Sequence, residues 1–148
     1  VEVIMTRSAQ EFVTPLTFQT MSGNQVVTDM FDPVHKWDTK HIELAKKAAL
    51  FVIVPATANV IGKIANGIAD DMLTTTVMAA RSPVLIFPAM NSYMYENPIV
   101  QENIEKLKKY GYHVFKTASG ELACGDTGSG KLPDWQEVVK EIEKFCNK

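Results

Sequence analysis

The 148-residue chain has little of what marks several specialised classes of protein. Its only two cysteines, Cys124 and Cys146, cannot build a disulfide framework, so we expect a reducing, cytoplasmic setting. With 17 acidic against 15 basic residues, it has no basic excess for nonspecific nucleic-acid binding. No apolar run reaches the roughly 20 residues of a transmembrane helix, and the opening VEVIM favours a strand over a signal peptide.

A glycine-rich phosphate turn is also missing. Such a turn normally stands between a strand and a helix, whereas GDTGSG at 125–130 does not, so it is a weak phosphate-loop signal. A generic nucleotide-binding α/β domain remains an alternative, which flavin absorption by the purified protein would exclude. Asp70 and Asp71 imply no metal site, because adjacent side chains diverge on a helix.

What is present is an alternation of apolar strands and helices. Strands are predicted at 1–5, 50–54, 84–88 and 113–115. Helices are predicted from Thr14-Pro15 to about 22, from Asp38 to about 50, over about 60–80 with a break at Asn66-Gly67, over 98–110 and over 134–146. Residues 116–133 are expected to be a long polar loop. The alternation predicts one α/β domain over 1–148 with a doubly wound, mostly parallel sheet.

Apolar stripes assign buried faces to two of these helices. The first is formed by Trp37, His41, Leu44 and Ala48, and the second by Trp135, Val138, Ile142 and Phe145. In such folds, ligands bind beyond the carboxyl ends of the strands. That rule selects four segments, which we expect on one edge: 6–8, 55–59, 88–91 and 120–131.

Two side chains could take part in proton transfer. His41 is expected in the first turn of its helix, where the helix dipole favours a neutral imidazole that can act as a base. The alternative is a packed histidine beside Trp37 and Leu44. Cys124 lies in a polar, glycine-dense loop close to Asp126, which favours a protonated thiol and suits a proton donor. A structural role for Cys124 is equally compatible with the spacing.

The corner FPAMNSYMYENP, residues 87–98, follows an apolar strand. Asn91 has donors and an acceptor that could hold a carboxylate or a flavin edge, yet Asn commonly satisfies the local backbone of a turn. Met90 and Met94 could pack against a flat ligand or fill the core. From the residues alone, both interpretations stay open.

Three segments resemble, in order, the signature segments of the flavin-dependent cysteine decarboxylases: KHIELAKKAALFVIVPATAN, PAMNSYMYENPIVQEN and GELACGDTGSGKL. The resemblance extends over essentially the whole chain. It implies a Rossmann-like flavoprotein that binds FMN and forms homotrimers, which can assemble into dodecamers, with sites between subunits. It also implies thiol oxidation of a cysteine conjugate, loss of CO2 and reduction of the resulting enethiol.

Matched motif by motif, the resemblance also implies roles for individual residues. His41 would be the active-site histidine and Cys124 the proton donor of the reductive half. Substrate contacts would come from Asn91, Met94 and Lys131, the last within a mobile flap. The flavin-contacting positions that it implies are Ser8, Thr57, Ala58, Asn59 and Ala89.

Two features favour one branch of this family. Ala89 stands where peptide-acting members typically have Asn, and the clamp ACGDTGSGK is complete. Both favour the branch that converts phosphopantothenoylcysteine to phosphopantetheine in coenzyme A biosynthesis. The alternatives are a peptidyl-cysteine decarboxylase of lantibiotic maturation and a non-catalytic relative that regulates a phosphatase, although such relatives usually carry long acidic tails.

The family's usual first strand and GxSGxIAAYK-like turn, which help bind the flavin phosphate, have no counterpart in this sequence. We therefore expect either a piece of a longer, commonly bifunctional protein or a supply of those residues from elsewhere.

Overall fold

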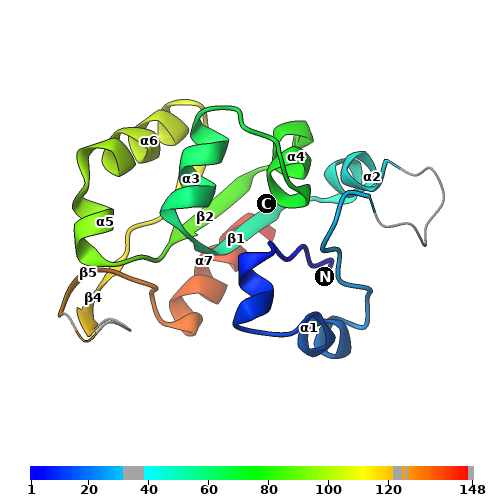
Figure 1. The fold of residues 1–148 in the computed structure, drawn as a ribbon, viewed down its shortest axis with the longest axis horizontal. Helices are drawn as coiled ribbons and strands as arrows, with labels where there is room; N and C mark the ends of the chain where they lie inside the picture. Colours follow the sequence, from blue (N-terminus) through cyan, green and yellow to red (C-terminus); the bar gives the residue numbers. More distant parts are fainter. Residues whose placement is uncertain (32–38, 122–124, 126, 147–148) are drawn as a thin grey trace. The chain divides into compact units, whose positions relative to one another are not determined.

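The computed structural model describes residues 1–31, 39–121, 125 and 127–146. They divide into two compact units, which are drawn together in Figure 1. The first unit comprises residues 1–47 and 68–81, and the second comprises residues 48–67 and 82–148.

The second unit is built on a three-stranded parallel sheet. Its strands, in spatial order, are β1 (Phe51–Ala56), β2 (Val84–Pro88) and β3 (His113–Val114). In the register, Phe51 faces Val84 across one pair and Leu85 faces His113 across the other. β2 is central and buried along its whole length, as its continuous apolar run predicts for a strand covered on both faces.

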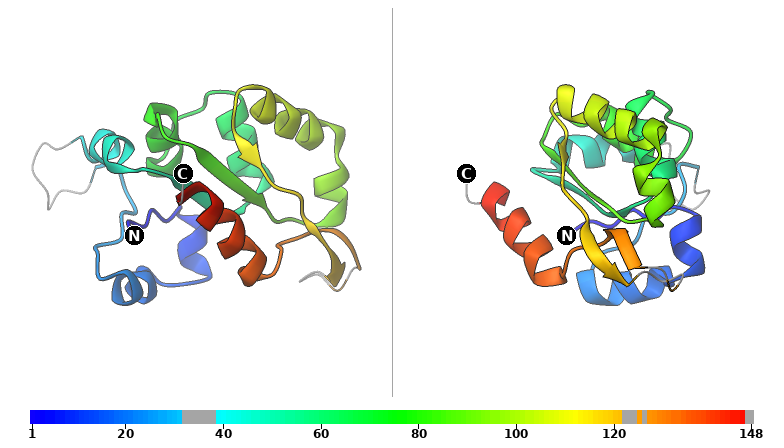
Figure 2. Two further views of the ribbon diagram at one scale, coloured as in Figure 1. Left: turned by 180° about the vertical axis from the view of Figure 1, so that it is seen from behind. Right: turned by 90° about the vertical axis from the view of Figure 1, so that its left-hand side faces the viewer.

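Helices cover both faces of this sheet. Within the part of this unit that the structure describes, the helices are α3 (Ala58–Ala65), α5 (Ser92–Glu96), α6 (Pro98–Lys109) and α7 (Trp135–Cys146). α3 and α6 pack together over one face, and α7 crosses the other (Figures 1 and 2). Under α7, Val138 joins Leu85 and Phe87 in an apolar cluster. Phe87 also stacks on Phe115, with ring centroids 4.4 Å apart. The predicted doubly wound α/β class is confirmed.

The first unit is mainly helical. Its helices are the 3-10 helix η1 (Ser8–Glu11), α1 (Pro15–Ser22), α2 (Lys40–Lys47) and α4 (Met72–Ala79). The strand predicted at 1–5 is reduced to an isolated parallel bridge between Ile4 and Val27. Its backbone hydrogen bonds join Met5 N–H to Val27 O at 3.0 Å and Val27 N–H to Val3 O at 2.9 Å. The alternating pattern of residues 1–5 indicated extended backbone, but among the described residues its pairing with Val27 is an isolated bridge and not part of a sheet.

Helix boundaries follow the local signals in the sequence. Pro15 stands at the first position of α1, and Gly23 ends that helix with φ +70°. The break predicted near Asn66-Gly67 separates α3 from α4, with Gly67 at φ +69°. α2 falls within the helix predicted from Asp38, while Asp38 and Trp37 lie outside the described residues.

Two expectations about the C-terminal third are wrong. Residues 116–133 are not simply a loop, because they contain the antiparallel hairpin of β4 (Ala118–Glu121) and β5 (Thr127–Lys131). Polar, glycine-rich strands lack the apolar alternation by which strands are recognised. Trp135 is 71% exposed, so it does not share the buried stripe of Val138. It is the first residue of α7, where the helix has only just begun.

Among the residues that the structure describes, no helix is long and apolar enough to cross a bilayer.

Candidate functional site

A backbone hydrogen bond joins the ends of two neighbouring strands (the strand exits) in the second unit. The amide of Ala89, just after β2, donates to the carbonyl oxygen of Ala56 at the end of β1, with an N–O distance of 2.9 Å. The segments 55–59 and 88–91 therefore meet at the carboxyl ends of neighbouring parallel strands, as the sequence predicted. This edge is where α/β sheets hold ligands.

The first of these exits becomes the start of α3. Thr57 caps that helix: its Oγ1 accepts from Val60 N–H at 3.4 Å, and its carbonyl oxygen accepts from Ile61 N–H at 3.0 Å. The earliest amides of a helix have no acceptor within it, so those of Ala58 and Asn59 point out of the helix start. With Thr57 and Asn59 exposed, the turn offers donors to an oxygen-rich ligand.

The second exit is shaped by Asn91. This half-buried residue caps α5, and its Oδ1 accepts from Tyr93 N–H at 2.9 Å. The carbonyl end of the side chain thus serves the local turn, which was one of the two interpretations open from sequence. The amide end is the part with donors for a carboxylate. Met94, further along α5, is 48% exposed.

The hairpin β4–β5 docks on this second exit. Met90 N–H donates to the carbonyl oxygen of Gly130 at 3.0 Å, and Gly130 N–H donates to Thr117 Oγ1 at 3.1 Å. Gly130 is buried with φ +105°, and a Cβ there would collide with the carbonyl oxygen of Met90. Only glycine permits so close an approach of the two backbones.

Lys131, the next residue, is exposed, and its aliphatic stem lies beside Gly120 on the partner strand. The segment predicted as a clamp therefore lies against the Asn91 corner. Its tip, including Cys124 and Asp126, lies outside the described residues.

The remaining predicted site residues belong to the first unit. His41 is the second residue of α2 and is half-buried, on a helix whose Leu44 and Ala45 are buried and which packs on α4. Ser8 begins η1 and is exposed. The structure thus brings together the predicted residues around Thr57, Ala89 and Asn91, whereas His41 and Ser8 are placed within another unit.

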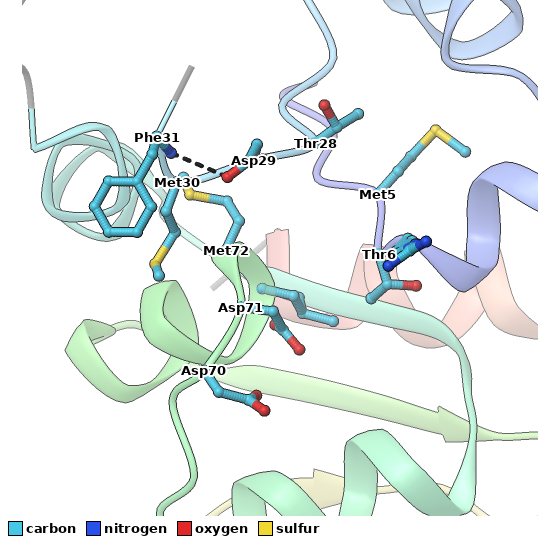
Figure 3. A pocket seen from close by; sticks show the side chains of 11 residues that line it. Met5, Thr6, Thr28, Asp29, Met30, Phe31, Asp70, Asp71 and Met72 are labelled. Atoms are coloured by element: carbon cyan, nitrogen blue, oxygen red, sulfur yellow. Dashed lines mark hydrogen bonds between the residues drawn. The ribbon is translucent and has the colours of Figure 1, made fainter. Parts of the chain in front are cut away.

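The first unit contains a cavity of about 220 Å³ (Figure 3). Three segments meet around it. Its lining residues are Met5, Thr6, Arg7, Thr28, Asp29, Met30, Phe31, Asp70, Asp71, Met72 and Leu73. Thr6 and Arg7 fall in the segment that the sequence selected, but residues 28–31 were missed because they follow no predicted strand.

The sequence favours Asp70 and Asp71 as surface or interface residues of one long helix, whereas in the structure Asp71 caps the start of α4. Its Oδ1 accepts from Thr74 N–H at 2.8 Å and from Thr74 Oγ1 at 2.9 Å, in a reciprocal capping box. The spacing of Asp and Thr three residues apart was the signal that could have located this helix start. Among the residues described, no three His, Cys, Asp or Glu side chains gather as a metal ion would require.

Comparison with known proteins shows the family to which the chain belongs. The family model described as Flavoprotein matches residues 1–147. The chain is 52% identical over 144 residues to the coenzyme A biosynthesis bifunctional protein CoaBC of Bacillus subtilis (strain 168), covering 97% of this chain and 36% of that protein. It is 43% identical over 146 residues to a probable phosphopantothenoylcysteine decarboxylase of Streptococcus mutans serotype c, covering 97% of this chain and 82% of that protein. The chain therefore spans about a third of the length of the bifunctional relative.

Solved structures show the same fold. The FMN-dependent cysteine decarboxylase SpaF superposes with a TM-score of 0.81 at 35% identity, covering 98% of this chain and 79% of that one. A mutant PPC decarboxylase complexed with pantothenoylaminoethenethiol superposes with a TM-score of 0.86 at 27% identity, covering 100% of this chain and 84% of that one.

Proposed function

This chain belongs to the flavoprotein family, alongside its cysteine decarboxylases, and on that premise we propose that it catalyses the FMN-dependent decarboxylation of phosphopantothenoylcysteine. The product would be phosphopantetheine, an intermediate of coenzyme A biosynthesis. The observation that carries the proposal is the PAMN corner, where Asn91 stands at the carboxyl end of the central strand beneath a glycine-built hairpin.

The residues at the strand exits fit a flavin. Thr57, Ala58 and Asn59 provide outward-pointing amides and polar side chains, and Ala89 keeps the neighbouring exit small. Such a set suits the carbonyl and nitrogen edge of a planar ring system. Ser8 in the first unit is a further proposed contact. FMN, when bound, would accept two electrons from the substrate thiol and later return them.

The chain's own groups would then hold the substrate and manage its protons. Asn91 Nδ2 would donate to the substrate carboxylate, with its orientation set by the bond from Tyr93 N–H to Oδ1. His41 would accept the thiol proton as the thiol is oxidised. The thioaldehyde accepts the electron pair released when CO2 leaves, and Cys124 would supply a proton to the resulting enethiol. Met94 and Lys131 are proposed to line the substrate's path.

The assembly and the cellular setting are part of the same proposal and rest on the family resemblance of the sequence motifs. We propose that residues 1–148 act as one flavoprotein decarboxylase domain, in a homotrimer that can build dodecamers with sites between subunits. The two cysteines are compatible with a reducing cytoplasm.

A direct test incubates the purified protein with FMN and phosphopantothenoylcysteine and measures CO2 and phosphopantetheine. We expect turnover, its loss by a factor of about 100 or more in His41→Asn, in line with a missing general base, and CO2 release with accumulated enethiol in Cys124→Ser. Normal product formation by Cys124→Ser would overturn the proton-donor role. No turnover by the unsubstituted, flavin-loaded protein would overturn the proposal.

The second candidate is decarboxylation of a peptide with a C-terminal cysteine. The likeness to the epidermin biosynthesis protein EpiD of Staphylococcus aureus, with 34% identity and a TM-score of 0.79, favours it. Running a C-terminal-Cys peptide beside phosphopantothenoylcysteine separates the two, because turnover of the peptide alone would reverse our choice of substrate.

A further inference from the structure

We propose that Ser92, Glu96 and Ser129 are positioning residues that set how firmly the β4–β5 hairpin sits on the Asn91 corner. Glu96 and Ser129 hold the hairpin in place, and the buried hydroxyl of Ser92 weakens its hold. The effect on docking stands on contacts within the second unit alone. Its consequence for substrate binding rests on the proposed function.

The docked position is defined by backbone. Met90 N–H reaches the carbonyl oxygen of Gly130 across 3.0 Å. Gly130 has φ +105°, and a Cβ there would collide with the carbonyl oxygen of Met90. Met90 and Asn91 are adjacent, so any separation of β5 from Met90 changes the surroundings of Asn91. The amide of Met90 is therefore a direct reporter of docking.

A side-chain bond secures the hairpin at a second point. Ser129 Oγ donates to a carboxylate oxygen of Glu96, the last residue of α5, at 2.8 Å. The acceptor is a carboxylate, which strengthens the bond relative to one between neutral groups, while exposure to solvent keeps its contribution modest. Because α5 begins beside Asn91, the bond joins the far end of the same short helix to the middle of β5.

Ser92 acts in the opposite direction. Its Oγ is buried and has no hydrogen-bond partner among the described residues. Gly128 lies directly against it, since a Cβ at that glycine would collide with Ser92 Oγ. Burying a hydroxyl without a partner costs free energy, whereas water would satisfy it once the hairpin lifted. The docked hairpin is therefore held by one side-chain bond and opposed by one buried hydroxyl.

The two effects predict that substitutions at these residues change hydrogen exchange of the Met90 amide in opposite directions. Ser129→Ala and Glu96→Ala should each speed hydrogen exchange of the Met90 amide by about 3- to 10-fold, the range of one modest hydrogen bond. Ser92→Ala should slow that exchange by a comparable factor. Ser129→Thr keeps a hydroxyl and should stay within about twofold of the unsubstituted protein.

The experiment measures exchange at Met90 by NMR in the purified protein, with Tyr112 N–H, which donates to Leu107 O at 3.1 Å, as the internal reference. The reference should not move. The double variant Ser129→Ala/Glu96→Ala should exchange no faster than either single variant, because both remove the same bond. Unchanged Met90 exchange in Ser129→Ala, or faster exchange in Ser92→Ala, would overturn the inference.

A kinetic measurement separates this inference from the proposed function. With phosphopantothenoylcysteine, we expect Ser129→Ala to raise KM by about 3- to 10-fold with a smaller change in kcat, and Ser92→Ala to lower KM. Altered exchange without altered KM would contradict substrate binding at this corner while supporting the positioning role. Altered KM without altered exchange would overturn the positioning role.

Discussion

At the scale of single residues, the corner at residues 88–91 depends on two positions. Asn91 must hold its side chain in one orientation, and Gly130, which packs against Met90, must have no side chain. Asn91 uses its carbonyl oxygen to cap α5, so its amide end is directed by the turn itself. Gly130 approaches Met90 so closely that a methyl group has no space. The chemistry proposed for Asn91 therefore depends on backbone geometry on both sides of it.

Gly130→Ala tests this dependence. We expect it to destabilise the hairpin by about 1–3 kcal/mol or more, because a φ of +105° is strained for alanine and the Cβ meets the carbonyl oxygen of Met90. Gly111→Ala is the matched control, since Gly111 has φ +89° with no neighbour near its Cβ. Urea denaturation of both variants separates strain from collision; equal losses would show that the contact with Met90 has no cost.

At the scale of elements, caps and packing decide where helices begin. α4 starts at Asp71 because that carboxylate satisfies the amide and hydroxyl of Thr74, which is fully buried. The break between α3 and α4 was predicted from Asn66-Gly67. The restart at Asp71 was missed, because the region was interpreted as one interrupted helix and the Asp71–Thr74 spacing was not used.

Removing this cap should destabilise the first unit. Asp71→Ala is expected to lower the free energy of unfolding by about 1 kcal/mol, within the 0.5–2 kcal/mol measured for such caps. Asp71→Asn should lose much less, because Asn is also a good cap. Thermal or urea unfolding followed by circular dichroism checks both, and equal losses in the two variants would show that charge, not capping, is what Asp71 contributes.

At the scale of the whole molecule, the charge is nearly balanced, with 17 acidic and 15 basic residues. Burial or a hydrogen bond shifts the pKa of three described residues: Tyr112, Glu2 and Lys47. Burial raises the pKa of Tyr112 above its usual 10.0. A hydrogen bond with Lys47 lowers the pKa of Glu2, and the same hydrogen bond raises the pKa of Lys47. The Glu2–Lys47 pair joins Nζ and Oε1 at 2.6 Å on an exposed surface, where such pairs contribute little.

Tyr112 predicts a loss of stability in alkali. Its raised pKa means that folding favours the neutral phenol, so its contribution is fully present below about pH 10 and is lost as the pH rises through the folded-state value. Urea midpoints measured across pH 9 to about 11 should fall more steeply in the unsubstituted protein than in Tyr112→Phe. Parallel curves would contradict this assignment.

Much of the fold and part of the site could be predicted from sequence. The strands β1 and β2 were recognised by their continuous apolar runs, of which only β2 is buried along its whole length. The helix α6 was recognised by the helical period that burial of one face leaves in the residues. The family resemblance is confirmed by the comparisons. The hairpin was missed, because its strands are specified by glycine conformations and a backbone hydrogen bond to Met90, which leave no apolar period.

Sequence by itself determined the α/β class, the family and the segments at the strand ends, since periodicity and motif order are properties of the chain. Only the tertiary structure decided how those segments meet in the second unit. There, Ala56 bonds to Ala89, Met90 to Gly130, and Glu96 to Ser129. These contacts join residues far apart along the chain, and no local preference encodes a hydrogen bond whose partner lies in another element.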